Sequence, residues 1–274
     1  MPTPIFTSAV VFQRPDGAIL TARKRGTHRF MLIGGKPEAG ETARLTALRE
    51  TREEVGITLE PNDLELIGMW RTRAANESGR DVHGTVFRCR QPLEDLPTPA
   101  AEIEQVRWLE RVDHEPDDLA PLLATRVLPA LGWRRGDWCE TNPLSVAPWD
   151  CGHLPVAEYG APGPMRAHLT GLIVAGKKVA TSSRLADYAG ADLPHVGTLE
   201  RICGEDGALL GVVETEDVQV VPLSEVSDEF AVAEGEGFVD AAQWRHAHEW
   251  FWAGQPLPDT ELVVTERIRF HAGV

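Results

Sequence analysis

The sequence predicts an α/β protein of two domains. We expect an α/β/α sandwich with a mixed sheet, followed by a β-barrel with flanking helices. The chain has 274 residues, more than one compact domain usually needs, and 42% of them are hydrophobic, which is enough for a substantial core. In the first half, short apolar runs of strand length surround one long helical pattern. In the second half, extended runs predominate between two amphipathic helical stretches.

Six strands are predicted in the first half from short runs of apolar and β-branched residues. They are residues 6–12, 18–24, 30–33, 64–71, 82–88 and 105–110. A helix is predicted over 42–55, because nothing there breaks a helix and Gly56 stands where a left-handed residue would end it. Its expected buried stripe is Ala43, Ala47, Leu48, Thr51 and Val55. Residues 118–131 predict an apolar helix that covers the sheet.

A turn-rich connector separates the two halves. It predicts a first domain over 1–135, a linker over 136–146 and a second domain over 147–274. The second domain is expected to hold helices over 165–175 and 241–252 and extended segments over 197–203, 209–215, 218–221 and 261–270. A Gly-Glu-Asp-Gly turn joins the first two of these extended segments and predicts a hairpin. In the last helix, Trp244, His248 and Phe251 or Trp252 form the expected core stripe.

Carboxylates at fixed spacing mark the helix over 42–55. Glu50, Glu53 and Glu54 stand at positions i, i+3 and i+4 and therefore share a neighbouring face. Three carboxylates this close repel one another unless a cation lies between them, and hard oxygen ligands suit Mg2+ or Mn2+. Arg49 can pair with one of these glutamates and orient it. The alternative is a solvated acidic helix, which any single triplet at this spacing more often indicates.

The complete pattern is more specific than the triplet. It runs G-x5-E-x7-R-E-x-x-E-E-x-G-I over residues 35–57. The pattern resembles the Nudix box of the Nudix hydrolases, with Thr51 in place of the usual aliphatic residue. The resemblance implies hydrolysis of a nucleoside diphosphate linked to another group. The implied metal ligands are Glu50, Glu53, Glu54 and the Gly35 carbonyl, and the implied catalytic residues are Glu53, Glu54 and Arg49, with Glu53 as the favoured general base.

Two neighbouring regions carry further candidates. Glu102 and Glu104 precede the strand that holds Trp108, and family members often use a glutamate of this region as an additional metal ligand or base. The sequence leaves open which of the two glutamates takes this role. It also allows that both belong to an ordinary solvated loop. A basic cluster before the box, Arg23, Lys24, Arg25 and Arg29, can grip phosphate oxygens. Among these we assign the phosphate role to Arg23.

Three stretches of the second half carry another resemblance. They are Gly-Lys-Lys-Val-Ala-Thr-Ser-Ser from 176, Leu-Pro-His-Val-Gly from 193, and Ala-Glu-Gly-Glu-Gly from 233, with Trp-Arg-His-Ala-His from 244. Together they resemble an ASCH domain, a PUA-like barrel. Such domains were long regarded as RNA binders, and some small bacterial members deacetylate 4-acetylcytidine with a Lys, a Thr and a Glu. These fall on Lys178, Thr181 and Glu236, but Ser183 stands where the family has an Arg, with Arg184 next to it. The alternative to a ligand site is a helix C-terminus at Lys177 and Lys178 and an exposed glycine-rich loop at Glu234 and Glu236.

Charge and composition limit the partners. The net charge is -15, and residues 141–274 carry 8 basic and 20 acidic side chains. A half this acidic is not expected to bind a long RNA, and Lys177, Lys178 and Arg184 would suffice for one nucleotide. The sequence shows no apolar run long enough for a membrane span and no signal peptide, so we expect a cytoplasmic protein. The four cysteines follow no zinc spacing and are expected to be free thiols.

These observations favour an enzyme: a Mg2+-dependent Nudix pyrophosphohydrolase for a nucleoside di- or triphosphate or a derivative, including modified nucleotides. Its second domain would bind or process a nucleoside or nucleotide. One alternative is an RNA-directed Nudix protein, in which the second half docks RNA. Another is a bifunctional enzyme with 4-acetylcytidine-type amidohydrolase activity. A sensor that binds without turnover is disfavoured by the intact Glu53 and Glu54. The base, the leaving group and the oligomeric state stay open.

Overall fold

The computed structural model describes residues 4–77, 79–111, 117–133 and 148–272. These residues form two compact units, the first ending at Asp150 and the second beginning at Cys151. The sequence placed the linker at 136–146, which lies outside the described residues, so the proposed domain limits stay a proposal. Among the described helices, none has both the length and the apolar composition of a membrane span.

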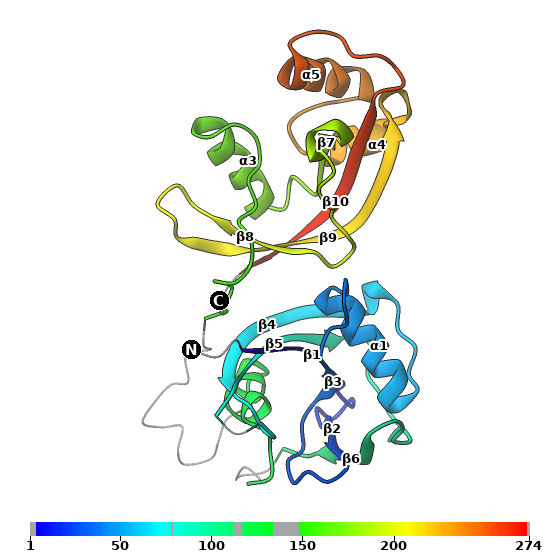
Figure 1. Ribbon diagram of the computed structural model, residues 1–274, viewed down its shortest axis with the longest axis vertical. Helices are drawn as coiled ribbons and strands as arrows, with labels where there is room; N and C mark the ends of the chain where they lie inside the picture. The colour runs from blue at the N-terminus through cyan, green and yellow to red at the C-terminus, as the bar shows by residue number, and fades with distance from the viewer. Residues whose placement is uncertain (1–3, 78, 112–116, 134–147, 273–274) are drawn as a thin grey trace. The chain divides into compact units, whose positions relative to one another are not determined.

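The first unit is built on a four-stranded mixed sheet (Figure 1). Its strand order is β3-β1-β5-β4, with β1 (Ile5–Val11) parallel to β5 (Asp81–Cys89). The outer strands β3 (Ile33–Gly35) and β4 (Leu64–Arg73) run antiparallel to their neighbours. A separate antiparallel pair is formed by β2 (Ile19–Lys24) and β6 (Ile103–Leu109). The mixed sheet and five of the six predicted strands are thus confirmed, with limits shifted by a few residues. The strand predicted over 30–33 shares only Ile33 with β3, and Phe30 and Met31 form isolated bridges instead.

The long helix α1 (Ala43–Val55) begins and ends where the sequence predicts. The Thr42 hydroxyl accepts from the Leu45 backbone N–H, and Gly56 adopts the left-handed conformation with φ 68°. Its buried face is wider than the expected apolar stripe, because Ala47, Thr51 and Val55 are buried together with two carboxylates, Glu50 and Glu54. Ala43 and Leu48 are only half-buried.

The helix predicted over 118–131 is shorter and irregular. Its central turn is a π-helix over Leu123–Val127 (η2), followed by α2 (Leu128–Ala130). The Leu128 N–H reaches the Leu123 carbonyl, one residue beyond the α-helical partner. The segment before the helix is not helical, because the Asp118 carbonyl accepts from the Phe30 N–H at 2.7 Å. A 3-10 turn, η1 (Pro61–Asp63), precedes β4.

The second unit is a curled antiparallel sheet that forms half of a barrel (Figure 1). Its order is β7-β10-β9-β8, and the elements are α3 (Pro164–Val174), β7 (Ala180–Arg184), η4 (Leu185–Tyr188), β8 (Leu199–Cys203), β9 (Leu209–Pro222), η5 (Leu223–Glu225), α4 (Asp228–Ala233), α5 (Ala241–Ala253) and β10 (Leu262–Ala272). The predicted hairpin is confirmed, and the extended segment at 218–221 is the end of the long strand β9. Strand β7 and helix α4 were not predicted.

The core of the second unit is centred on α5. Trp244 is fully buried and stacks on His248 at a centroid distance of 4.5 Å, and Trp252 packs edge-on against both rings. Of the two alternatives for the third member of the stripe, Trp252 is therefore correct, while Phe251 is 52% exposed. Cys89 and Cys151 are buried free thiols and Cys203 is a half-buried one, as expected, while Cys139 lies outside the described residues.

Candidate functional sites

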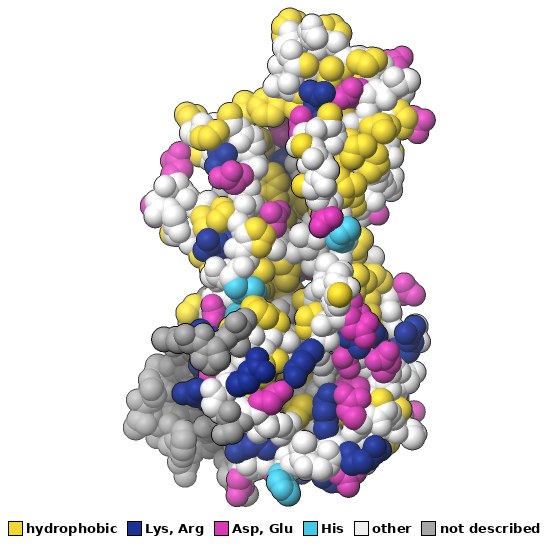
Figure 2. Space-filling view, viewed as in Figure 1, with side chains coloured by type: hydrophobic (Ala, Val, Ile, Leu, Met, Phe, Trp, Pro, Cys, Tyr) yellow, Lys and Arg dark blue, Asp and Glu magenta, His cyan; other side chains and the backbone are white. Residues whose placement is uncertain are grey.

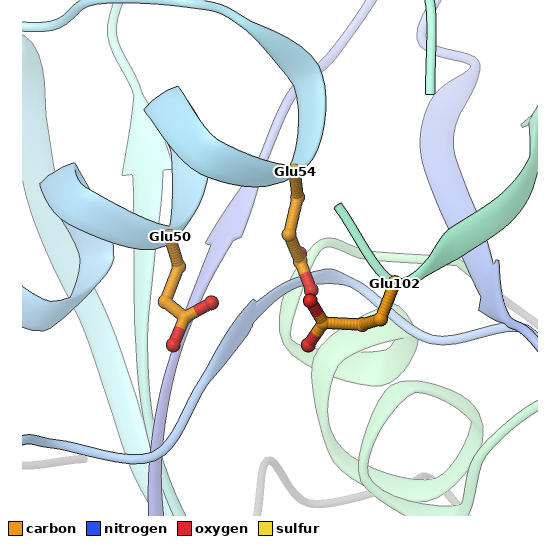
Figure 3. Close-up of side chains that lie close together, drawn as sticks. All are labelled: Glu50, Glu54 and Glu102. Atoms are coloured by element: carbon orange, nitrogen blue, oxygen red, sulfur yellow. The ribbon is translucent and has the colours of Figure 1, made fainter. Parts of the chain in front are cut away.

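Three glutamates of the first unit converge, two from α1 and one from the loop that leads into β6 (Figure 3). Oxygen atoms of Glu50, Glu54 and Glu102 lie within 4.8 Å of one another. Glu50 and Glu54 are one helical turn apart and project from the same face of α1, where both are buried. Glu102 is the acidic residue of its region that joins them, whereas Glu104 forms an ion pair with Arg23.

The glycine loop at β3 holds the first two carboxylates closely. The Gly34 N–H donates to Glu54 Oε2 at 2.9 Å. Gly35 packs against Glu50 so tightly that a Cβ atom at position 35 would lie 2.2 Å from Glu50 Oε1. A side chain at this position would therefore displace the Glu50 carboxylate, so the glycine is required by the close approach.

Lys24 lies among these acids. Its Nζ is 3.1 Å from Glu54 Oε1 and 2.7 Å from Glu102 Oε1. Burial raises the pKa of Glu54 to about 7, and the Lys24 charge and the Gly34 N–H offset this only in part. Hydrogen bonding from Lys24 lowers the pKa of Glu102. A lysine ammonium is thus the positive charge that Glu54 and Glu102 face.

Arg49 links the helix to the loop before it. Its guanidinium donates to Glu41, Glu50 and Glu53, and to the Lys36 carbonyl at 3.1 Å. The hydrogen bond from Arg49 is the main reason why the pKa of Glu41 falls to about 2. Glu53 lies at the edge of this network with its side chain 46% exposed and does not belong to the three-glutamate group. Arg49 is therefore placed to orient Glu50, as the sequence indicated.

A cavity of about 500 Å³ adjoins the three glutamates. Its walls include Glu50, Glu102 and Gly35, and its basic lining residues are Lys24, Lys36, Arg49 and Arg73. Arg23, to which the sequence assigned the phosphate role, is not among its lining residues. The Arg23 guanidinium instead donates to Glu104 and to the Thr27 carbonyl. The side chain in this basic cluster that does line the cavity is the neighbouring Lys24.

The donor set suits a hard divalent cation. Three converging carboxylates, two of them buried, together with the Gly35 backbone at the cavity wall, offer the oxygen ligands that Mg2+ and Mn2+ prefer. Carboxylates at this spacing repel one another, and the two cations that pair with them, Lys24 and Arg49, offset the three negative charges only in part. The residues present therefore fit the metal that the pattern implies.

The second unit contains a buried charge network around Lys178, which is 3% exposed. Its ammonium donates to Glu234 at 3.0 Å and to Glu236 at 2.6 Å. Glu234 also accepts from Ser182 at 2.6 Å and from the Trp244 indole at 3.0 Å. Burial by itself would raise the pKa of Glu234, but His248 and Lys178 outweigh it and hold the pKa at about 2.

Glu234 was not among the predicted site residues, although the Ala-Glu-Gly-Glu-Gly stretch contains it. The glycine between the two glutamates explains why both reach Lys178. Gly235 has φ +69°, and a Cβ there would meet the Lys177 carbonyl oxygen at 2.2 Å. The loop therefore presses against the backbone that precedes β7, which brings both carboxylates to the same ammonium.

The predicted residues of this unit line one cavity of about 660 Å³, which contains Lys178, Thr181 and Glu236. Two cations proposed with Lys178 for a single nucleotide do not join it. Lys177 is exposed and Arg184 pairs with Glu261 at 3.0 Å. Of the three cations, only Lys178 is therefore among the lining residues of this cavity.

Both halves match known families. A model of the NUDIX domain matches residues 4–130, and a model of the ASCH domain matches residues 156–270. A MutT-like protein from Streptomyces ambofaciens is 32% identical over 123 residues, which cover 45% of this chain and 74% of the relative. Among solved structures, an ASCH domain from Lactobacillus crispatus is 28% identical with a TM-score of 0.39, covering 43% of this chain and 80% of the other. A MutT protein from Methanosarcina mazei is 22% identical with a TM-score of 0.34, covering 40% and 79%.

The family matches, together with the carboxylate helix, define the first unit as a Nudix domain and the second as an ASCH domain. The chain belongs to the Nudix hydrolases and acts on the phosphoric anhydride bonds of pyrophosphates. Members of this family generally use divalent metal ions and act on small-molecule substrates.

Proposed function

We propose that the protein is a Mg2+- or Mn2+-dependent pyrophosphohydrolase for a nucleoside di- or triphosphate or a derivative, including modified nucleotides. The observation that supports this most directly is the convergence of Glu50, Glu54 and Glu102 beside the cavity of about 500 Å³. A cavity of this size accommodates a small nucleotide. The clustered glutamates adjoin this cavity, and the anhydride of a bound substrate would have to lie next to them.

The roles we propose follow from the positions of the side chains. Glu50, Glu54 and Glu102 hold the metal with the Gly35 carbonyl, and Arg49 fixes the Glu50 carboxylate. When bound, the metal neutralises phosphate charge and acidifies a water ligand. Glu53 keeps its proposed role as general base, because its half-exposed carboxylate is outside the buried ligand group and is held by Arg49 at 3.1 Å.

Phosphate contacts are proposed for Lys24 and Lys36 as well as for Arg23. Lys24 and Lys36 both line the cavity. Arg23 would have to leave Glu104 to reach a phosphate, since that carboxylate accepts from it at 2.8 Å. Lys24 also has carboxylate partners, Glu54 and Glu102, but unlike Arg23 it already lines the cavity.

The decisive experiment is a substrate screen of the purified full-length protein. A panel of canonical and modified nucleotides is incubated with Mg2+, and the release of phosphate or pyrophosphate is followed. We expect turnover that EDTA abolishes and that Mg2+ or Mn2+ restores. Turnover that persists after exhaustive chelation would contradict the proposed metal dependence.

For the second domain we propose that the cavity at Lys178 binds or processes a nucleoside or nucleotide. Its support is the buried Lys178–Glu234–Glu236 network beside Thr181, since buried charges are costly and cluster at functional sites. Docking of a long RNA is disfavoured, because residues 141–274 hold 8 basic and 20 acidic side chains. Amidohydrolysis of a 4-acetylcytidine-type substrate stays an alternative.

The second site is tested independently of the first. Lys178→Ala is expected to remove ligand binding and any deacetylation of 4-acetylcytidine while leaving the anhydride hydrolysis unchanged. Because Lys178 is buried, Thr181→Val serves as a gentler variant that retains the ion network. Tight, salt-sensitive binding of a 20-mer RNA by the chain, lost in Lys178→Ala, would instead favour the RNA-directed alternative.

A further inference from the structure

A cation of the chain itself lies among the three clustered glutamates. The Lys24 ammonium is 2.7 Å from Glu102 Oε1 and 3.1 Å from Glu54 Oε1, so two of the proposed metal ligands share it. The third, Glu50, pairs with Arg49 at 2.9 Å instead. Figure 3 shows that the Glu54 and Glu102 carboxylates point toward one another. Lys24 thus offsets the charge where a carboxylate of α1 meets one of the loop before β6.

This ion pair differs from the surface pairs of the first unit. Figure 2 shows many Lys and Arg side chains among Asp and Glu side chains on the face of that unit turned to the viewer. An example is the pair of Lys36 and Glu77, whose side chains are 60% and 39% exposed. Exposed pairs of this kind contribute little to stability. The Glu54 side chain, by contrast, is 1% exposed, and a carboxylate removed from water needs a positive partner.

The backbone holds Lys24 beside Glu102, while its side chain stays movable. Lys24 is the last residue of β2, and its partner on β6 is Ile103, next to Glu102. The Arg25 N–H donates to the Glu102 carbonyl at 2.9 Å, which fixes the two segments just beyond that pair. The Lys24 side chain is 25% exposed and lines the cavity of about 500 Å³. Its flexible four-carbon stem therefore lets the ammonium turn from the glutamates into the cavity while the strand stays in place.

An ammonium and a divalent cation compete for the same carboxylate oxygens. The ammonium donates N–H groups to their lone pairs, and a metal ion binds through those same lone pairs. The two cations also repel each other at such short distances. Because the Lys24 ammonium contacts both Glu54 and Glu102, it must give up these partners when the two residues ligate a metal.

The other basic residues that line the cavity are anchored elsewhere. Lys36 and Arg73 pair with acids outside the glutamate group. The Arg49 guanidinium contacts Glu50, but it also donates to the Lys36 carbonyl and to a glutamate that precedes α1, so it has partners left when Glu50 ligates a metal. Among the described lining residues, Lys24 is therefore the cation whose two acidic partners both belong to the glutamate group.

We propose that Lys24 is an internal counterion that the divalent metal displaces. Without metal, its ammonium stabilises Glu54 and Glu102 and lowers the affinity of the site for the ion. With metal bound, the ammonium turns into the cavity and contacts the anionic part of the substrate. This inference rests on the proposed metal ligands and adds an exchange of partners to the proposed phosphate contact of Lys24. Since coupling between two ligands is reciprocal, an anionic substrate that holds the ammonium in the cavity also tightens metal binding.

The test measures Mn2+ binding by the full-length protein without nucleotide, by electron paramagnetic resonance of the free ion. Lys24→Met removes the ammonium and should bind Mn2+ at least about fivefold more tightly than the parent. Lys24→Arg retains a cation that can reach the same carboxylates, and its affinity should stay within about twofold of the parent. Lys36→Met is the control for charge alone, because this exposed lysine also lines the cavity but pairs with Glu77; its affinity should change by at most about twofold.

The lysine signals report the exchange of partners directly. The chain has four lysines, at positions 24, 36, 177 and 178, so labelling of lysine with 13C at Cε gives a simple nuclear magnetic resonance spectrum. The signals of Lys24 and Lys36 are those missing in Lys24→Arg and Lys36→Met. Addition of Mg2+ without nucleotide should shift the Lys24 signal more than any other, because its ammonium leaves Glu54 and Glu102.

Thermal unfolding accounts for any loss of stability in the variants. Lys24→Met leaves the buried Glu54 carboxylate without its ammonium, so its metal-free Tm should be lower than that of the parent. Mg2+ should raise the Tm of this variant by more than that of the parent, because tighter binding stabilises the folded state more.

The outcomes separate this inference from the proposed metal site. Equal or weaker Mn2+ binding in Lys24→Met, or a Lys24 signal that Mg2+ does not move, would overturn the inference while the metal site stands. Absence of Mn2+ binding by the parent and by every variant would refute the proposed metal site itself.

Discussion

At the scale of single residues, the structure places the adjacent glutamates Glu53 and Glu54 of the proposed active site differently. Glu54 is completely buried and accepts from the Gly34 N–H, whereas the Glu53 side chain is 46% exposed and pairs with Arg49. Adjacent residues of a helix point about a quarter-turn apart, so one enters the ligand group and the other stays at its rim. The two positions can therefore be distinguished by experiment.

Replacing either glutamate should impair catalysis, with different effects on metal binding. We expect Glu54→Gln and Glu53→Gln each to lower kcat by at least about 10^2-fold, since one removes a ligand charge and the other the proposed base. Only Glu54→Gln should weaken Mn2+ binding strongly, measured by electron paramagnetic resonance of the free ion. Glu94→Gln, an exposed acid without a described partner, is the matched control. Parental turnover in the double Gln variant would exclude the mechanism.

Glu266 should make the second unit less stable as the pH rises. Its pKa in the folded state is about 7, above the ordinary 4.5, because burial disfavours the charged form. The folded state then binds the proton more tightly, so this stabilisation is complete below pH 4.5 and is lost as the pH rises through 7. Allowing for partial solvent screening, the free energy of unfolding falls by on the order of 1–3 kcal/mol between these pH values.

Thermal unfolding of the second unit at pH 5 and pH 8 measures this effect. The drop in Tm between the two conditions should be smaller in Glu266→Gln than in the parent, because the neutral amide no longer titrates. Glu205→Gln, which removes an exposed acid from the β8–β9 turn of the same unit, is the control and should show the parental drop. An identical drop in all three proteins would show that the Glu266 carboxyl is not destabilised by its burial.

At the scale of elements, the first site depends on how closely β3 approaches α1. A Cβ at Gly35 would lie 2.2 Å from Glu50 Oε1, and the obstructing group is the end of a flexible side chain rather than backbone. The helix can therefore stay in place while its carboxylate moves. The Glu50 carboxylate, a proposed metal ligand, is therefore the group that responds to a change in the spacing.

We expect Gly35→Ala to retain the fold and to lose metal affinity. Its Tm should stay within a few degrees of the parent, whereas Mn2+ affinity and kcat should each fall at least about tenfold, because the displaced Glu50 no longer points at the ion. Gly171→Ala, at an open position in α3, provides the control. Unchanged Mn2+ affinity in Gly35→Ala would remove Glu50 from the proposed ligands.

At the scale of the whole molecule, the first unit includes residues beyond the predicted end of its domain. Trp149 is 7% exposed, the Asp150 N–H donates to the Met69 carbonyl at 2.8 Å, and His83 Nε2 lies 2.7 Å from the Asp150 carbonyl. These contacts join residues 149 and 150 to β4 and β5. A fragment that ends at 135 lacks them.

A fragment of residues 1–150 should therefore be folded and active on its own, since all three clustered glutamates and their cavity lie within it. The shorter fragment 1–135 should have a Tm lower by roughly 2–8 °C, from the lost burial of one tryptophan at about 2 kcal/mol. Thermal unfolding and the nucleotide screen measure both fragments. An inactive but folded 1–150 fragment would mean that the second unit completes the active site.

The sequence by itself determined the features that depend on neighbours along the chain. The cap at Thr42, the end of α1 at Gly56 and the shared face of Glu50 and Glu54 follow from helix geometry and local hydrogen bonding, which act over a few residues. The Nudix and ASCH resemblances also follow from such local motifs, and the strands follow from short-range hydrophobic alternation.

Only the tertiary structure decided which distant residues meet. Glu102 rather than Glu104 joins the α1 glutamates because the register of β2 against β6, with its irregularity at Arg23 and Lys24, fixes how the preceding loop is placed. The same register pairs Arg23 with Glu104 and turns Lys24 toward Glu54. Contacts between residues this far apart along the chain depend on strand pairing and on packing in three dimensions, and a linear pattern of residue types does not encode that geometry.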